Sequence, residues 1–262
     1  MNADTPPLPS APESVRGVCS SERLPLMEQY AELLSSEAVV RGLIGPREVP
    51  RLWDRHIANS AILATVLPAD ASVCDIGSGA GLPGLVLAIA RPDLSVTLVE
   101  PLLRRTTFLE EVVAQLHLTN VEVLRGRADA LHGLRSFDVV TSRAVAPLDR
   151  LLAWSMPLVS AHGALIALKG SSISEEIETA RPVLKSFRCA EPEILELGAD
   201  VLESATHAVR VSWADPSALP LHLINKTASK RPSRDKSKKP ADRRRGVSTR
   251  DAVGDKRKSS RG

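Results

Sequence analysis

Apolar residues from about position 72 onward follow two alternating patterns. Short runs rich in Val, Ile and Leu are separated by longer segments in which apolar residues recur at helical spacing. Strands that alternate with helices in this way predict a parallel sheet with helices on both faces. The predicted strands are residues 73–76, 96–100, 121–124, 137–142, 164–168 and 208–213, and the predicted helices are residues 83–90, 102–116, 148–156 and a segment that begins at Ser174 and is interrupted at Pro182.

Two further helical patterns precede the first strand. They cover residues 24–44 and 52–67, and Pro46 and Pro68 end them. We expect these helices to pack as a cap on the α/β domain that follows. The predicted organisation is a disordered N-terminus at residues 1–23, a helical cap at 24–70, the α/β domain at 71–214, and a linker with a basic disordered tail at 215–262.

Charge is divided unevenly along the chain, although the formal net charge is only +3. Residues 226–262 hold 15 Lys and Arg against 4 Asp, a charge of +11, so residues 1–225 carry a charge of −8. A segment so basic and so poor in apolar residues cannot offset its ordering entropy by burial, and we expect it to be disordered until it binds. Its composition fits both a contact with the phosphates of a polyanion and a solubilising extension.

Composition narrows the class of protein. Aromatic residues make up 3% of the chain, which disfavours recognition of nucleic acid by a platform of stacking rings. Cys19, Cys74 and Cys189 lie far apart and no His or Cys spacing matches a metal site, so reduced thiols in a cytoplasmic protein without metal are expected. The longest apolar runs are near six residues, too short to span a membrane.

A glycine-rich loop follows the first predicted strand. Asp75 lies near the end of this strand, and four glycines follow at positions 77, 79, 81 and 84. Glycines in such a loop allow the backbone to turn and to approach a ligand, and the last of them allows the next helix to pack on the sheet. Glu100 ends the second strand, where a carboxylate can accept both hydroxyls of a ribose. The two segments predict a cofactor that contains a nucleoside.

Two cofactors fit this loop. Gly79, Gly81 and Gly84 satisfy G-x-G-x-x-G, and Glu100 follows at about the expected distance, so an NAD(P)-dependent oxidoreductase is one interpretation. Asp75 favours the other, because a pyrophosphate would lie badly beside a carboxylate. S-adenosylmethionine has no phosphate and carries a positively charged amino-acid end.

Polar residues also follow the later strands. Asp129 is placed to accept a hydrogen bond from an adenine amino group while the Ala128 backbone packs beside the ring, although an Asp here also suits a helix start. Arg143 emerges from a buried strand and needs an anionic or carbonyl partner. The cofactor carboxylate, a base edge of the substrate and a structural salt bridge all fit. Lys169 presents a weaker version of the same argument.

Histidines and nucleophiles offer no clear catalytic group. His56 lies among apolar residues at helical spacing, which favours a packed and hydrogen-bonded core histidine over a catalytic one. No Ser-His-Asp arrangement or reactive cysteine is evident, which argues against hydrolysis and covalent catalysis.

Four short segments together identify a family that the chain resembles. Over about residues 24–213 it is similar to the bacterial 16S ribosomal RNA guanine-N7 methyltransferases, the RsmG or GidB family. The segments are Arg55-His56-x-x-x-Ser60, Asp75-x-Gly77-x-Gly79-x-Gly81-Leu82-Pro83-Gly84, Ser142-Arg143-Ala144 and Leu168-Lys169-Gly170.

The resemblance implies a class I S-adenosylmethionine-dependent methyltransferase fold, Rossmann-like with a mostly parallel sheet. It implies transfer of a methyl group to N7 of one guanine in the decoding-region hairpin of 16S rRNA, as naked RNA or within the small subunit or an assembly intermediate. A non-catalytic RNA-binding or ribosome-assembly factor with the same fold is a further alternative. The basic tail lies beyond the family pattern.

The resemblance also implies roles for individual residues. Cofactor contacts fall to a set of strand-end residues, and Arg143 or Lys169 is expected to hold guanine O6 as a catalytic residue. Guanine N7 already has a free lone pair, so no general base is required. The resemblance places cofactor contacts at Gly77, Leu82, Ala128, Asp129 and Arg143. Glu100 fits the general ribose-binding position of the fold, and Gly79 is expected to bind the cofactor because a glycine allows close approach of the backbone.

Overall fold

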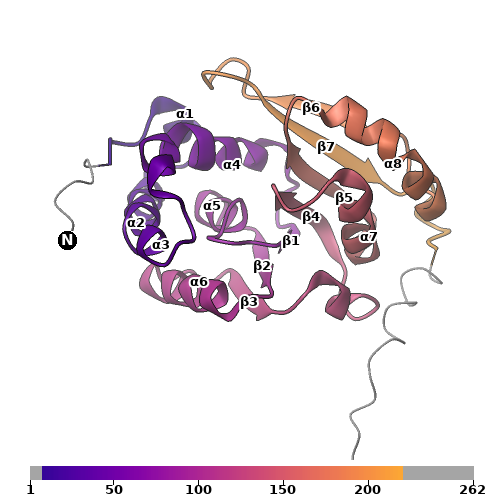
Figure 1. Cartoon of the computed structure of the whole chain (residues 1–262), viewed down its shortest axis with the longest axis horizontal. Helices are drawn as coiled ribbons and strands as arrows, with labels where there is room; N and C mark the ends of the chain where they lie inside the picture. The colour runs from indigo at the N-terminus through magenta and orange to yellow at the C-terminus, as the bar shows by residue number, and fades with distance from the viewer. Residues whose placement is uncertain (1–7, 221–262) are drawn as a thin grey trace, which may run out of the picture. The chain divides into compact units, whose positions relative to one another are not determined.

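A seven-stranded sheet organises the chain in the computed structural model, which describes residues 8–220 (Figure 1). The strand order is β3-β2-β1-β4-β5-β7-β6. The first five strands run parallel, whereas β7 is antiparallel to both β5 and β6. The predicted mostly parallel sheet is therefore confirmed. The strands are β1 (Ser72–Ile76), β2 (Ser95–Glu100), β3 (Val121–Arg125), β4 (Phe137–Arg143), β5 (Val159–Lys169), β6 (Glu193–Leu197) and β7 (Thr206–Ser212).

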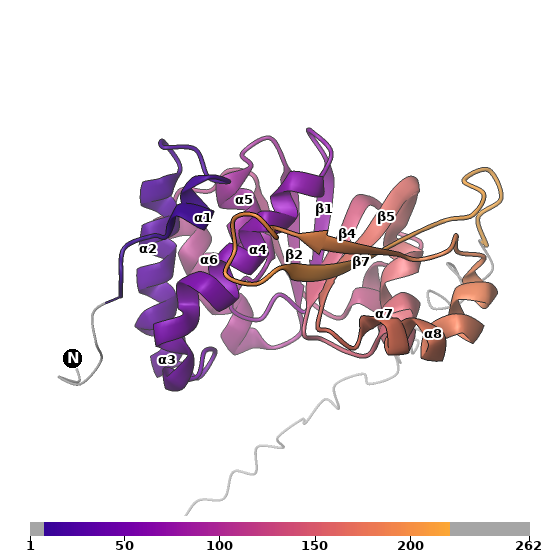
Figure 2. The same ribbon diagram turned by 90° about the horizontal axis from the view of Figure 1, so that it is seen from above.

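Helices cover both faces of this sheet. Successive strand residues point to opposite faces, so Val73 packs in one apolar layer and Cys74 in the other. In Figure 2, α7 and α8 lie side by side at the end of the described part opposite α2. The helices of the first layer are α2 (Leu24–Ser35), α5 (Gly84–Ala90) and α6 (Leu103–Gln115), and those of the second are α7 (Leu148–Ser155) and α8 (Ile173–Phe187).

The predicted helix at residues 52–67 consists of three helices of different pitch. A π-helix is followed by one turn of α-helix and then by a 3-10 helix, with Leu67 already extended before Pro68. The α-helical turn and the 3-10 helix pack on α5, the π-helix packs on α1 and α2, and all three share the apolar layer of α5. Besides α2, the elements before β1 are α1 (Glu13–Arg16), α3 (Glu37–Val40), η1 (Pro46–Arg51), η2 (Leu52–Ala58), α4 (Asn59–Ala61) and η3 (Ile62–Val66).

The expectation of a disordered segment at residues 1–23 is wrong for residues 8–23. Val15 in α1 is fully buried, and Ala11 packs in the same layer. The indole Nε1 of Trp53 donates a hydrogen bond to the carbonyl of Pro9 at 2.6 Å. Apolar burial and this anchor therefore fix a segment whose Pro, Ala and Ser content suggested disorder. The predicted basic tail at 226–262 lies outside the described residues.

Two further elements, β6 and α8, differ from the sequence prediction. β6 was not predicted, because this edge strand is mostly exposed and has no continuous apolar run. α8 continues through Pro182 rather than breaking there, since its buried face, including Ile177 and Leu184, is anchored in the core. It begins at Ile173 after Ser172, so Ser174 lies within the helix and does not cap it.

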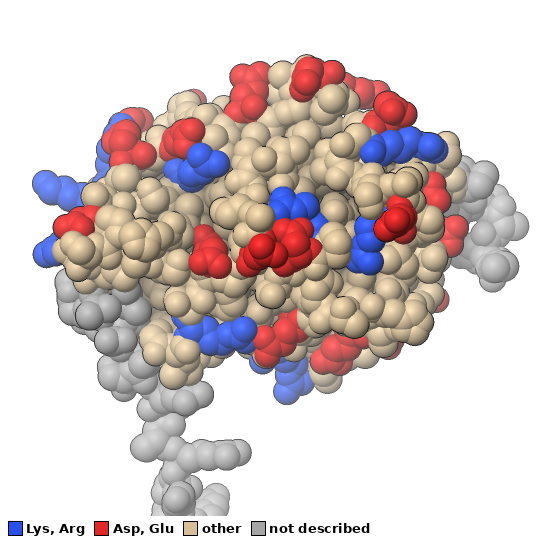
Figure 3. All heavy atoms as spheres, turned by 180° about the vertical axis from the view of Figure 1, so that it is seen from behind, with Lys and Arg blue, Asp and Glu red and all other residues tan. Residues whose placement is uncertain are grey.

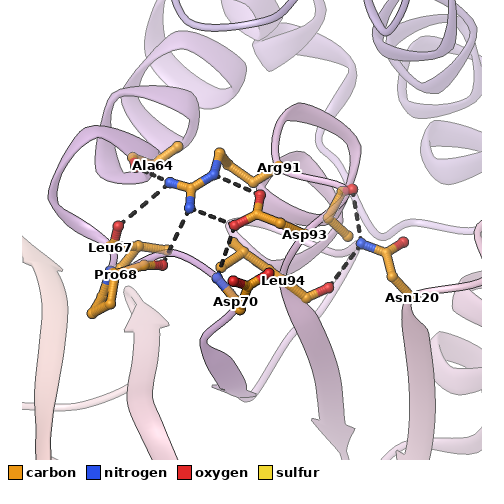
Figure 4. Close-up of polar contacts among 9 residues, drawn as sticks. Ala64, Leu67, Pro68, Asp70, Arg91, Asp93, Leu94 and Asn120 are labelled. Atoms are coloured by element: carbon orange, nitrogen blue, oxygen red, sulfur yellow. Dashed lines mark hydrogen bonds and ion pairs between the residues drawn. The ribbon is translucent and has the colours of Figure 1, made fainter.

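Arg91 connects the N-terminal helices to the sheet (Figure 4). Its guanidinium donates to the carbonyls of Ala64, Leu67 and Pro68 at 3.0, 3.4 and 3.2 Å, and it forms an ion pair with Asp93 at 2.6 Å. Asp93 in turn accepts from the Asp70 backbone at 3.0 Å. The end of η3 is thereby held against the turn between α5 and β2.

Candidate active site

A cavity of about 780 Å³ opens at the carboxyl ends of β1, β2 and β4. This position lies at the switch in strand order between β1 and β4, where open α/β sheets bind their ligands, and the volume suits a molecule the size of a nucleoside cofactor. The lining residues include Leu43, Ile44, His56, Ile76–Ala80, Leu82, Val99–Leu102, Arg105, Gly126–Asp129, Arg143–Val145 and Trp154.

The glycine loop forms one wall of this cavity. Gly79 has a φ of +59°, which other residues adopt only with strain. A side chain at Gly84 would come within 2.7 Å of the Asp75 Oδ2 atom, so the close approach of α5 to β1 requires glycine there. The loop thus combines an unusual backbone shape with tight packing underneath.

Asp75 stabilises the end of this loop through a hydrogen bond to the backbone at the start of α5. Its carboxylate is fully buried, it does not line the cavity, and Oδ2 accepts a hydrogen bond from the Gly84 backbone at 3.0 Å. Burial raises the pKa of Asp75 to about 7, although the Gly84 hydrogen bond to its carboxylate lowers it. Asp75 therefore fixes the start of α5 instead of contacting a ligand directly.

Glu100 joins the loop to the end of β2. Its Oε2 accepts from the Gly79 backbone and its Oε1 from the Leu102 backbone, both at 3.0 Å. Arg105 contributes a longer contact to Oε2 at 3.4 Å. The residue is only 1% exposed, yet it lines the cavity. A carboxylate oxygen can accept two hydrogen bonds, and Oε1 accepts one, from Leu102, so it can still accept one from a ligand hydroxyl.

Ala128 and Asp129 begin the short helix η4 (Ala128–Leu131) on another side of the cavity. Ala128 is buried, and the Asp129 carboxylate lies 3.7 Å from Nε of the exposed Arg127 side chain. Asp129 lies in the first turn of η4 and lines the cavity. It therefore keeps acceptor capacity at the cavity edge.

Arg143 reaches from the end of β4 to the N-terminal helices. Its Nη1 donates to the carbonyl oxygen of His56 at 3.1 Å, and its Nη2 contacts His56 Nδ1. The other ring nitrogen, Nε2, lies 2.8 Å from Glu48 Oε2. Burial and the charge of Arg143 lower the pKa of His56 despite the opposing effect of Glu48.

This group of three residues refines the sequence interpretation. Arg143 does have a carbonyl partner, but the partner is His56 of η2 and not an acid. His56 is packed and hydrogen-bonded as predicted, and it also lines the cavity. Sequence reasoning missed Glu48, which no motif singles out.

Lys169 lies apart from the other predicted site residues. It does not line the cavity, and its Nζ bonds the Ala146 carbonyl at 2.9 Å and Glu176 Oε2 at 2.7 Å. Glu176 Oε2 also accepts from the Leu148 backbone at 2.9 Å. Lys169 therefore stabilises the loop that follows β4, through the Ala146 carbonyl, and this geometry offers no support for a contact with the substrate.

Within residues 8–220, no group of three His, Cys, Asp or Glu side chains is placed to hold a metal ion. In that same range, no helix has the length and apolar character needed to cross a membrane.

A nucleoside cofactor with an amino-acid end fits the residues of this cavity. The buried carboxylate of Glu100 lies where a ribose diol is held in this kind of sheet, and glycine backbone surrounds it. The predicted cofactor residues Gly77, Gly79 and Leu82 line the same cavity. S-adenosylmethionine is compatible with this donor set because it needs no phosphate site.

The chain is similar to known proteins over most of its length. A family model described as GidB, rRNA small subunit methyltransferase G, matches residues 23–200. A protein of that description, "Ribosomal RNA small subunit methyltransferase G" of a Nocardioides species, is 67% identical over 79% of this chain and 83% of its own. Relatives with the same name in Thermobifida fusca and Streptomyces avermitilis are 53% and 51% identical, over 73% and 78% of this chain and 81% and 86% of theirs.

These matches agree with the class I methyltransferase fold and lend no support to an oxidoreductase or to a non-catalytic factor. The family model covers well over half of this chain, and the relatives match this chain along most of their own length. The chain therefore belongs to the GidB family, the rRNA small subunit methyltransferases G.

Proposed function

We propose that the protein transfers a methyl group from S-adenosylmethionine to N7 of one guanine in the decoding-region hairpin of 16S rRNA. The observation that carries this proposal is the cavity at the switch point, in which the buried Glu100 carboxylate lies against the glycine loop. The names of its relatives support rRNA of the small subunit as the substrate class. We assign the reaction to the cytoplasm.

S-adenosylmethionine supplies, when bound, an electrophilic methyl group on a sulfonium centre. In this chain, Glu100 would accept the ribose hydroxyls, and Asp129 would accept from the adenine amino group beside the Ala128 backbone. Gly77, Gly79 and Leu82 would shape the wall around them.

The substrate needs alignment more than acid–base chemistry. Guanine N7 carries a lone pair and no proton, so no residue has to remove one. Arg143 has five N–H donors, and two of its nitrogens are engaged by His56. Its remaining donors are available for guanine O6 or for the cofactor carboxylate, and a fixed cation there would orient either acceptor.

Mapping of 7-methylguanosine in 16S rRNA tests this function. The purified protein should add one methyl group per small-subunit RNA, and mass spectrometry of RNase fragments should place it in the decoding-region hairpin. Naked rRNA, assembly intermediates and mature subunits should be compared as substrates. Methylation of a different nucleoside, or none on all three substrates, would overturn the proposal.

A further inference from the structure

His56 holds Arg143 at two points in the cavity wall. Its backbone carbonyl accepts from Nη1 at 3.1 Å, and its ring Nδ1 contacts Nη2. The two residues are 87 positions apart in sequence, so this contact joins the N-terminal helices to the end of β4. Both residues line the cavity.

Hydrogen-bond chemistry selects one form of the His56 ring. A guanidinium can only donate, so Nδ1 must be the acceptor and carry no proton. The proton of the neutral ring is then on Nε2, which donates to Glu48 Oε2 at 2.8 Å. Glu48 thus stabilises the tautomer that Arg143 requires.

The local backbone holds the same residue in place. His56 lies in the π-helix η2, a helix type often found at functional sites. Its carbonyl also accepts from the Ser60 hydroxyl at 2.6 Å. The helix and Ser60 therefore hold the His56 carbonyl that accepts from Arg143, and Glu48 holds the His56 ring.

We propose that His56, in its neutral form with the proton on Nε2 and held by Glu48, is a positioning residue that orients Arg143 for methyl transfer. The inference rests on the proposed function, because it assigns Arg143 to the substrate or cofactor. His56 itself takes no part in proton transfer to the substrate.

Protonation of His56 would break this arrangement. A proton on Nδ1 would face an N–H of Arg143, so two donors and two positive charges would meet. The charged groups that face His56 are Glu48, Arg143 and Arg55. Because the pKa of His56 is lowered, the neutral form persists below its usual range, and methyl transfer should fail only in more acidic solution.

Three variants test the role, with single-turnover methylation of the substrate RNA measured from about pH 5 to 8. His56→Phe removes the acceptor and should lower the rate constant about 10- to 100-fold, because misplaced catalytic groups lose that much. His56→Asn places an amide oxygen near the position of Nδ1, so it should restore most of the rate without the acidic decline. Glu48→Gln should move the acidic decline to lower pH, since Glu48 raises the pKa of His56.

His162→Asn is the matched control, because this exposed histidine of β5 does not line the cavity. Its rate and pH profile should equal those of the unmodified protein. Circular dichroism and urea unfolding should show that each variant is folded. Equal losses in His56→Phe and His56→Asn, or an unchanged acidic decline in His56→Asn, would overturn the positioning role. Absence of RNA methylation by the unmodified protein would instead refute the proposed function.

Discussion

Glu100 supports the glycine loop in addition to lining the cavity. Its two oxygens accept backbone hydrogen bonds from Gly79 and from Leu102, so one side chain sets the distance between the loop and the end of β2. A ligand hydroxyl that bonds Glu100 would meet an acceptor already held in position. At the scale of single residues, affinity for the cofactor should therefore depend on Glu100 and Gly79 together.

Glu100→Ala and Gly79→Val should each weaken S-adenosylmethionine binding by about 1 to 3 kcal/mol. The first removes a buried acceptor, and the second places a branched side chain at a positive φ. Calorimetric titration of the folded variants measures the change. Wild-type affinity in both would remove these residues from the cofactor site.

Arg143→Ala should reduce the rate of methyl transfer by about 100-fold or more, in the range found when a fixed donor is removed from an active site. Arg143→Lys should recover little of it, because one ammonium cannot reproduce the paired contacts to the carbonyl and ring of His56. Single-turnover rates at saturating cofactor measure both effects. Full recovery with lysine would show that only the charge matters.

Asp75 should make the protein less stable as pH rises from about 4 to 7. Its folded pKa, about 7, lies above its unfolded value of 3.8, so the native state binds more protons in this interval and loses that advantage as they dissociate. The contribution is up to roughly 4 kcal/mol for this buried group. Urea unfolding of Asp75→Asn across this range should show a flatter dependence on pH, and an identical dependence would contradict the assignment.

At the scale of the elements, the hydrogen bonds and the ion pair of Arg91 hold η3 against the turn before β2. Arg91→Ala would leave three carbonyls and the Asp93 carboxylate with lost partners (Figure 4). We expect a loss of about 2 kcal/mol in the free energy of unfolding, since hydrogen bonds to charged groups contribute at this level. Urea titration measures it.

Arg181→Ala is the matched control for this change. Among residues 8–220, the ion-pair partners of Arg181 are the exposed acids Glu178 and Glu191, and such surface pairs contribute little. The urea concentration at the unfolding midpoint of Arg181→Ala should stay near that of the unmodified protein. An equal loss of unfolding free energy in both variants would mean that Arg91 contributes only as a surface charge and does not connect η3 to the sheet.

The elements also show what the sequence could predict. The strands β1 and β2, most of β4 and the second half of β5 are mostly apolar because both of their faces are buried, whereas β3 lies at the sheet edge and has no fully buried residue. The glycine loop could be predicted because its glycines meet local requirements of backbone shape and packing. β6 was missed because an exposed edge strand needs no continuous apolar run. The π-helix and the link from Glu48 through His56 to Arg143 depend on contacts between distant segments, which neither spacing nor propensity records.

Charge is the dominant property at the scale of the whole molecule. Residues 1–225 carry a charge of −8, and one face of the described part mixes acidic and basic side chains without a broad basic field (Figure 3). An RNA substrate would gain little long-range attraction from such a surface. The +11 of residues 226–262 is the larger source of attraction.

Deletion of residues 226–262 should raise the apparent KM for the RNA and flatten its dependence on salt, because fewer counterions are released on binding. Cofactor affinity and turnover at saturating RNA should change little, since phosphate contacts position a substrate without selecting the base. Steady-state kinetics at several salt concentrations measure these quantities. Equal salt slopes with and without the segment would assign it a solubilising role only.

The shared apolar layer of the N-terminal helices and the sheet limits how modular this enzyme can be. Val15, Met27 and Leu63 belong to the same cluster as Val73 and Leu85, and His56 completes the cavity from the same side. A chain cut at residue 71 would lack the part of the cavity wall formed by Leu43, Ile44 and His56, and it would expose the face of α5 that these helices cover. The boundary that divides cap from catalytic domain along the sequence is therefore no place to recombine parts between relatives. Transplanting a foreign cap would require matching both the buried surface and the partner of Arg143.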